Sequence, residues 1–328
     1  MNRRSFVMAA LALASHARAQ EKSEVRLSTA TGPAFAIGKA GERWAALLTE
    51  SFASAYEVRH YPGATLALRD PLREFGALRD GAADMAVGSA LAWSAQLPPF
   101  AVYGLPWLAP EVREQEALAA AAGVRERIDA AAAAAGVVVI ATAPLGERAI
   151  ATFDGGITAP AALKGRTIRT TTIPLILDTL ATLGARPASM TLAEAQAQFA
   201  ARALDGQEGP PSTLAAARVA ASGLKFVTRW GAFADAMVFA VRQPLWSRWS
   251  PAQQAAAGVA ALTAAREAGA LAREDAAFGE LNKQGVDVVR PTPAQRAALR
   301  AAVESVWTKW TPAIGAELVA AAQAAVGT

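Results

Sequence analysis

Patterns typical of β-strands alternate with patterns typical of α-helices along most of this chain. The first strand pattern is VRLST at residues 25–29, and the clearest is VVVIAT at residues 137–142. Residues 38–52 carry apolar side chains near helical spacing, which predicts an amphipathic helix. Such alternation indicates an α/β fold with largely parallel sheets. Further strands are expected over residues 56–61, 85–88, 238–241 and 286–289, and further helices over residues 71–79, 175–183, 192–203 and most of the chain after 251.

The strand and helix patterns form two groups, which lie on either side of residues 143–147. With 328 residues, the chain is long enough for about two domains of roughly 150 residues each. No segment rich in Gly, Ser and Pro separates two independent domains. Two lobes joined by a chain that crosses between them therefore fit the sequence better than two domains on a linker.

The N-terminus has the pattern of an export signal. Two arginines precede an apolar run at residues 6–14, and residues 17–19 (Ala-Arg-Ala) fit an A-x-A cleavage site. The run is too short to span a bilayer permanently, and no other segment is long and apolar enough. The sequence therefore predicts an exported protein whose signal is removed near Ala19/Gln20. Residues 2–7 resemble a twin-arginine motif, so both that route and the ordinary Sec route remain open.

Net charge argues against a nucleic-acid partner. The whole chain has 32 basic and 28 acidic residues. The first 19 residues hold three arginines and no acid, so the remainder has 32 − 3 = 29 basic residues against 28 acidic ones, a net charge of +1. A chain that binds nucleic acid or an anionic membrane through charge would be more basic.

The residues offer little equipment for catalysis or metal binding. Cysteine is absent, which excludes disulfides, thiol catalysis and thiolate metal sites. Only His60 remains once the signal with His16 is removed, so a zinc site with several histidines is excluded. Asp205 and Glu208 follow a helix end, where acidic residues are common in turns. We therefore expect a binding protein, with no cofactor and no metal, rather than an enzyme.

Arg169 lies at the end of an expected strand in LKGRTIRTTTIP, residues 163–174. Open α/β sheets place ligand sites at the carboxyl ends of their strands. The planar fork of an arginine matches a carboxylate with two parallel hydrogen bonds. From these residues alone, Arg169 can be a carboxylate clamp or an ordinary surface charge.

The region around Arg169 resembles the signature of DctP-type solute-binding proteins of TRAP transporters, the tripartite ATP-independent periplasmic systems. Four pieces occur in order: L-K-G-x-x-I-R, L-G-A-x-P-x-x-M, a helix that begins near Glu194, and D-G-Q-E. The segments HYPGATLA, GALRDGAADMAVGS and FAVYGLPWL are also similar to family segments, so the likeness extends over nearly the whole mature chain.

This resemblance implies a two-lobed periplasmic binding protein fold, with a ligand cleft between the lobes and long C-terminal helices. Its members close on an organic acid and deliver it to a membrane permease. The expected division is an export signal at residues 1–19, a lobe I of residues 20–145 plus about 234–273, and a lobe II of about 146–233 plus 274–328.

The resemblance also assigns roles to single residues. Arg169 matches the arginine that clamps the ligand carboxylate, and Arg148 matches a second arginine that often assists. Three positions depart from the family pattern. Gly209 stands where an asparagine usually contacts the carboxylate, Leu192 stands near the place of an aromatic residue, and Ser89 stands where sialic-acid binders have an acid.

Trp93, Trp230 and Phe233 lie in segments that face the cleft in relatives, although each could equally belong to the core. Together with the departures, they predict a pocket that is more apolar and has fewer hydrogen-bonding groups. The expected ligand is an organic carboxylate with an apolar or aromatic body rather than a sugar acid. A C4-dicarboxylate is possible if Arg148 and Arg169 each take one carboxylate.

The expected partners are therefore a small organic acid and the membrane subunits of a TRAP permease, and the chain itself is not expected to span the membrane. Two alternatives stay open. One is a solute-binding protein that presents its ligand to a sensor, and the other is an exported enzyme on the same fold. The oligomeric state is also open, as is the question of whether a metal assists ligand binding, which occurs in some members of the family.

Overall fold

The computed structural model describes residues 23–52, 55–269 and 274–327. The predicted export signal and its cleavage site lie outside these ranges. Within them, no helix has the length and apolar character needed to cross a membrane.

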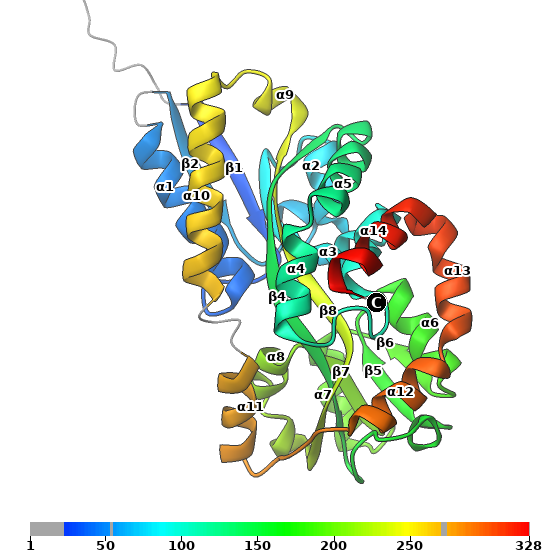
Figure 1. Cartoon of the computed structure of the whole chain (residues 1–328). Helices are drawn as coiled ribbons and strands as arrows, with labels where there is room; N and C mark the ends of the chain where they lie inside the picture. Colours follow the sequence, from blue (N-terminus) through cyan, green and yellow to red (C-terminus); the bar gives the residue numbers. More distant parts are fainter. Residues whose placement is uncertain (1–22, 53–54, 270–273, 328) are drawn as a thin grey trace, which may run out of the picture.

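The described residues form one sheet of nine strands that runs through both halves of the molecule (Figure 1). Its order is β2-β1-β3-β8-β4-β7-β5-β6, with β9 beside β8. The strands are β1 (Ser23–Thr29), β2 (Tyr56–Tyr61), β3 (Met85–Ser89), β4 (Val137–Thr152), β5 (Thr167–Thr170), β6 (Arg186–Ser189), β7 (Gly206–Gly209), β8 (Phe226–Arg242) and β9 (Asp287–Val289).

The helices cover both faces of this sheet. They are α1 (Ala36–Ser51), α2 (Glu74–Arg79), α3 (Ala90–Trp93), α4 (Val112–Ala120), α5 (Ala122–Ala134), α6 (Pro174–Thr182), α7 (Leu192–Ala200), α8 (Pro211–Ala216), α9 (Gln243–Trp246), α10 (Pro251–Gly269), α11 (Glu274–Lys283), α12 (Pro293–Ala301), α13 (Glu304–Ile314) and α14 (Ala316–Val326). The helix predicted over residues 71–79 is divided. Residues 71–73 form a 3₁₀ turn because the Asp70 side chain accepts a hydrogen bond from the Leu72 N–H, and α2 follows.

Two long strands, β4 and β8, join the two groups of strands. They pair antiparallel along most of their lengths, and each is far longer than the strands predicted at residues 137–142 and 238–241. The sequence suggests an earlier end for β4 because Pro144 and Gly146 are poor strand residues. In the structure they flank one of three register shifts, where an irregular strand tolerates them.

Residues 143–147 are therefore part of a strand rather than a loop that crosses between lobes. The sheet is parallel within each group, as predicted, in the pairs β1–β2, β1–β3, β5–β6 and β5–β7. It is antiparallel in the pairs β3–β8, β4–β8 and β4–β7, whereas β8 and β9 pair parallel. The prediction of largely parallel sheets does not include these antiparallel pairs. They arise because β4 and β8 are continuous strands that run through both groups.

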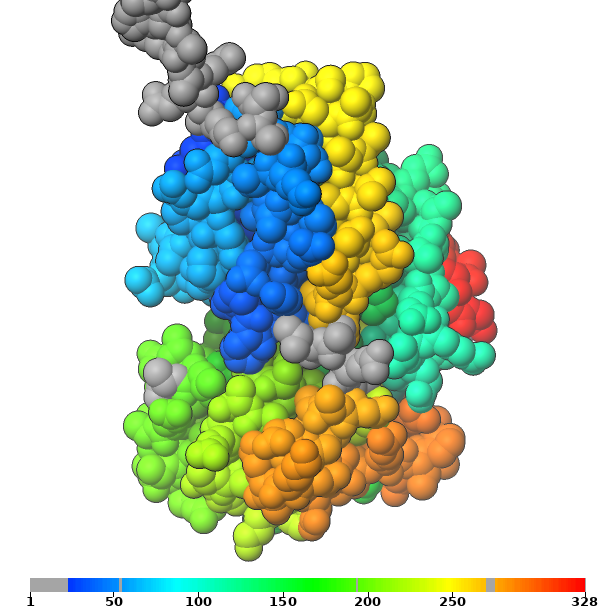
Figure 2. Space-filling view, turned by 90° about the vertical axis from the view of Figure 1, so that its left-hand side faces the viewer, coloured from blue at the N-terminus to red at the C-terminus, as the bar shows by residue number. Residues whose placement is uncertain are grey.

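Alanine-rich α10 packs against α1 over one face of the first group (Figure 1). Ala257, Ala261 and Ala264 are fully buried, and the Trp44 indole donates a hydrogen bond of 3.1 Å to the Ala257 carbonyl. Small side chains let the two helices lie close together, so α10 is buried through its alanines rather than through large apolar residues. In the space-filling view, the surface is indented between the blue and cyan residues of the first group and the green residues of the second (Figure 2).

The C-terminal helices contact both groups. Helix α13 packs against α6, whereas α14 packs against α4 and α5 (Figure 1). The lobe boundaries given above stay a prediction. The last helix lies against residues predicted for lobe I, although residues 274–328 are predicted for lobe II.

Candidate ligand site

Arg169 is a buried cation on β5. Its side chain is 5% exposed, and its Nε and Nη2 atoms donate hydrogen bonds of 3.0 and 2.9 Å to the Met190 carbonyl. No carboxylate of the described residues lies within 4.0 Å of its guanidinium. Burial lowers the pKa of Arg169, the charge of Glu208 acts to raise it, and the charge of Arg148 acts to lower it. Because an unpaired buried charge is unfavourable, this arrangement favours an anionic ligand at Arg169.

Arg148, on β4, is already engaged by an acid. Its Nε and Nη2 atoms donate to the two carboxylate oxygens of Glu208 at 2.6 and 3.0 Å, and Thr170 Oγ1 donates to the same carboxylate at 2.6 Å. Burial acts to lower the pKa of Arg148, but the pairing with Glu208 outweighs it and the pKa is raised. The neighbouring acid Asp205 is used elsewhere, since its carboxylate accepts from the Thr167 N–H. The two acids therefore do not form a hydrolase pair.

The two arginines start from opposite faces of the sheet. Thr170 bonds to Glu208 on the face that carries Arg148, and side chains alternate along a strand, so Arg169 lies on the other face. The predicted role of Arg148, which is to assist Arg169 in binding the ligand carboxylate, stays a prediction.

Gly209 ends β7 beside an open space. It is buried, yet a Cβ atom built on it would meet no heavy atom within 4 Å. Gln207, two residues earlier, points to the same face, and its Cα is in register with that of Arg169. In the sequence, D-G-Q-E is visible only as a family signature, and nothing there marks Gln207 as a ligand-binding residue. Leu192 opens α7 and is partly exposed.

Ser89 lies at the end of β3 and is bonded to a buried acid of β8. Its hydroxyl donates to Asp235 at 2.5 Å and accepts from the Ala92 N–H at 3.0 Å. The Asp235 carboxylate also accepts from the N–H groups of Leu91 and Ala236. Burial raises the pKa of Asp235, against the opposing effect of these hydrogen bonds. An acid inside the apolar run WGAFADAMVFAV was the signal that could have revealed Asp235.

The three predicted aromatic residues are all fully buried. Trp93 packs against Phe75 and Phe100, while Trp230 packs against Phe233. The structure thus places them in the apolar core, and their contact with a ligand stays a prediction. Trp230 lies beside the arginine network, because its indole donates a hydrogen bond of 3.2 Å to the Arg148 carbonyl.

Glu74 is a buried acid that the sequence analysis missed. It begins α2, is fully buried, and accepts hydrogen bonds from Ser28 Oγ at 2.8 Å and from the Trp93 indole at 3.4 Å. No basic side chain of the described residues forms an ion pair with it. Burial raises its pKa from the ordinary value of 4.5 to about 7, and the two hydrogen bonds act to lower it.

Replacing Glu74 with glutamine is expected to stabilise the protein at high pH. The folded state holds the Glu74 proton up to a pH of about 7, whereas the unfolded chain releases it near 4.5. Stability from this residue therefore falls as pH rises between those values. Glu74→Gln should leave the free energy of unfolding nearly unchanged at pH 4.5 and raise it by roughly 3 kcal/mol at pH 8. Urea unfolding of both proteins across this range measures the difference, and a difference that does not change with pH would contradict the expectation.

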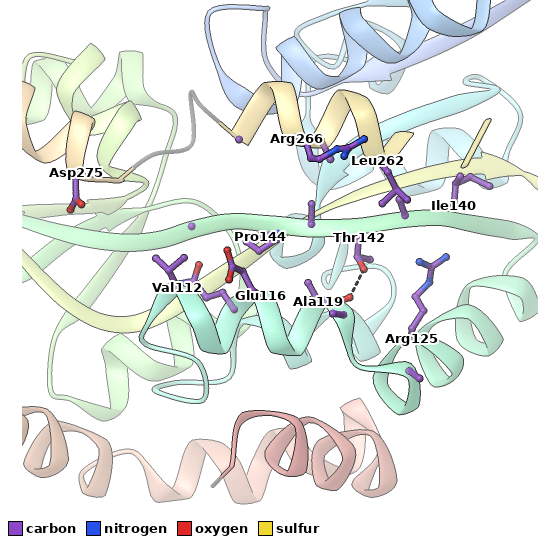
Figure 3. Close-up of a pocket in the computed structure, with 18 of the residues that line it drawn as sticks. Val112, Glu116, Ala119, Arg125, Ile140, Thr142, Pro144, Leu262, Arg266 and Asp275 are labelled. Carbon is purple, nitrogen blue, oxygen red and sulfur yellow. Dashed lines mark hydrogen bonds between the residues drawn. The ribbon is translucent and has the colours of Figure 1, made fainter. Parts of the chain in front are cut away.

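The described residues also form a groove of about 1260 Å³ (Figure 3). It is bordered by α4 and α10, with β4 along its floor, and Thr142 in its wall donates to the Ala119 carbonyl at 3.0 Å. None of the predicted site residues lines it. Across the described residues, no group of three or more His, Asp and Glu side chains is arranged to hold a metal ion.

The fold and the buried arginine site define a two-lobed α/β binding protein. Residues 27–312 match the family model described as bacterial extracellular solute-binding protein, family 7, named DctP. The match covers most of the chain, which therefore belongs to this family. No curated protein sequence matches the chain significantly.

Solved structures of TRAP periplasmic solute-binding proteins are similar over most of the chain. One from Ralstonia eutropha H16 is 38% identical, has a TM-score of 0.86, covers 93% of this chain and 99% of its own, and holds (S)-2-acetolactate. One from Bordetella bronchispeptica, with density interpreted as pantoate, is 22% identical with a TM-score of 0.79 over 92% and 99% of the two chains. One from Sulfitobacter sp. NAS-14.1, with bound β-D-galacturonate, is 17% identical with a TM-score of 0.81 over 93% and 100%. The last two show the fold alone.

Proposed function

We propose that this protein is the solute-binding subunit of a TRAP transporter, and that it captures a small organic carboxylate with Arg169 and delivers it to a membrane permease. The observation that carries the proposal is the Arg169 guanidinium, which is buried, unpaired with any described acid, and on the same sheet face as the open space at Gly209. Family membership supports the transport role and a periplasmic location after signal removal near Ala19/Gln20.

The ligand that fits best is a short, branched acid with an oxygen substituent beside its carboxylate. The relative at 38% identity holds (S)-2-acetolactate, an acid of this class. Gly209 contributes no side chain where relatives usually have asparagine, and Ser89 is bonded to Asp235. A sugar acid would bury several hydroxyl groups, and each one left unpaired costs about 1 to 3 kcal/mol. A C4-dicarboxylate is disfavoured because Arg148 is engaged by Glu208.

Binding would act by closing the two lobes around β4 and β8. A ligand held by Arg169 in the second group gains contacts to the first group only when the lobes close. Its binding energy then shifts the population toward the closed form, which is the form that a permease can recognise. No chemical step is required, which separates this proposal from an enzyme on the same fold.

Isothermal titration calorimetry of residues 20–328 with a panel of acids tests the proposal. The panel contains 2-acetolactate, succinate, galacturonate, benzoate and the neutral methyl ester of 2-acetolactate. We expect the tightest binding for 2-acetolactate and none for the ester, because the ester lacks the charge that Arg169 requires. Binding of galacturonate alone, or equal binding of acid and ester, would contradict the proposal. Recovery of 2-acetolactate unchanged after incubation separates a binder from an enzyme.

A further inference from the structure

We propose that the side-chain amide of Gln207 binds the oxygen substituent next to the ligand carboxylate, and so selects 2-oxygenated acids over acids without that oxygen. This inference rests on the proposed function and adds to it the residue that determines specificity. It gives a role to a side chain that neither the fold nor the arginine network uses.

Gln207 is buried but unsatisfied. Its side chain is 1% exposed, and both Nε2 and Oε1 lack a hydrogen-bond partner anywhere in the described chain. A buried amide is normally bonded, and leaving such a group unpaired is costly. Its two neighbours in register, Ala151 on β4 and Arg169 on β5, offer no acceptor to the amide. Beside the Arg169 clamp, this unpaired amide is available to a polar group of the ligand.

The placement of Gln207 relates it directly to the carboxylate clamp. Strands β5 and β7 are parallel neighbours, and the Cα atoms of Arg169 and Gln207 are partners in register. Both side chains therefore project from the same face, separated by one strand spacing of about 4.8 Å. Gly209 follows on the same face and leaves open space toward the carboxyl end of β7. A ligand in this space would meet a guanidinium on one side and an amide on the other.

The chemistry of an amide suits a 2-oxygen substituent. Glutamine offers two N–H donors and one carbonyl acceptor, so it can donate to a keto oxygen and can both donate to and accept from a hydroxyl. In a 2-oxygenated acid, the substituent oxygen is two bonds from the carboxylate carbon, only one bond farther than the carboxylate oxygens. When Arg169 holds the carboxylate, that oxygen falls within reach of a group one strand away. An unsubstituted acid would leave the amide unpaired, and sites built around a polar group reject such analogues strongly.

The test compares two acids that differ by one group. The acid 2-hydroxy-2-methylbutanoate carries a hydroxyl where 2,2-dimethylbutanoate carries a methyl group of similar size. Calorimetry should show that the wild-type protein binds the hydroxy acid about tenfold or more tightly. In Gln207→Leu the ratio of the two affinities should fall to near one, while both acids still bind through Arg169.

The melting temperature of the ligand-free protein separates a ligand role from a structural one. Because the amide has no protein partner, Gln207→Leu and the unbranched variant Gln207→Met should melt no lower than the wild type. A marked drop in both variants would overturn the inference, since it would show that the amide supports the fold.

Two other outcomes separate a failure of the Gln207 inference from a failure of the proposed function. If the affinity ratio persists in Gln207→Leu and Gln207→Met while Arg169→Ala loses both acids, this inference fails and the proposed function stands. If the wild type binds neither acid nor any other carboxylate, the proposed function fails and this inference fails with it.

Discussion

Replacing Arg169 with alanine is expected to abolish most of the affinity for the carboxylate ligand while leaving the fold intact. Truncating one partner of a buried charge pair costs about 2 to 5 kcal/mol, which corresponds to roughly 30-fold to several thousand-fold in the dissociation constant. The effect is large because the ligand carboxylate would then be buried without its counter-charge. Arg169 bonds only to the Met190 carbonyl in the described structure, so its removal should not lower the melting temperature of the ligand-free protein.

The matched control for this variant is Arg166→Ala. Arg166 lies three residues earlier and donates to the Asp154 carbonyl at 2.9 Å in an exposed setting. Calorimetric titration with 2-acetolactate should give nearly wild-type affinity for Arg166→Ala and little or no heat for Arg169→Ala. Equal affinity in the two variants would remove Arg169 from the site.

Replacing Glu208 with alanine is expected to cause the largest loss of stability. Arg148 is buried, and Glu208 supplies both of its carboxylate contacts. Without Glu208 the guanidinium charge would stay buried and unpaired, which costs about 3 to 5 kcal/mol. Thr170 would also lose its acceptor. Urea unfolding followed by circular dichroism measures this loss, and a loss below 1 kcal/mol would show that water or a rearranged side chain replaces Glu208.

Two further variants test whether the loss of stability comes from the buried charge that Glu208→Ala leaves unpaired. Glu317→Ala removes an ion pair with Arg127 at 3.3 Å, in which the glutamate side chain is 87% exposed, and should change stability by no more than about 0.5 kcal/mol. The double variant Arg148→Met with Glu208→Leu removes both charges of the buried pair. It should recover much of the stability lost in Glu208→Ala, because the cost arises from the charge left alone.

Many of the short strands and helices can be predicted from local sequence patterns, whereas the two long strands that connect the two groups cannot. The strands at residues 56–61 and 85–88 are predicted within one residue of their observed limits. Pro62-Gly63 marks the end of the first, and the second is a short apolar run after the turn at Asp80-Gly81. The full lengths of β4 and β8 could not be predicted. Pro144 and Gly146 look like a strand end, and only the partner strand reveals that they flank a register shift.

Some residues of the candidate site can likewise be recognised from the sequence, and others only from the structure. Arg169 stands out in the sequence because it ends a strand within a family signature. Glu74 does not stand out, and Asp235 is marked only as an acid within an apolar run, with no sign of its partner. Glu74 bonds to Ser28, 46 residues away, and Asp235 bonds to Ser89, 146 residues away. Such pairs depend on tertiary packing, which no local pattern encodes. Gln207 was visible in D-G-Q-E, but its lack of a partner required the structure.

The most direct test of the central claim is a crystal structure of the protein with 2-acetolactate. We predict that the ligand carboxylate lies within hydrogen-bonding distance of the Arg169 guanidinium, in the space beside Gly209. A ligand bound in the groove between α4 and α10, or one that turns its carboxylate away from Arg169, would contradict the claim.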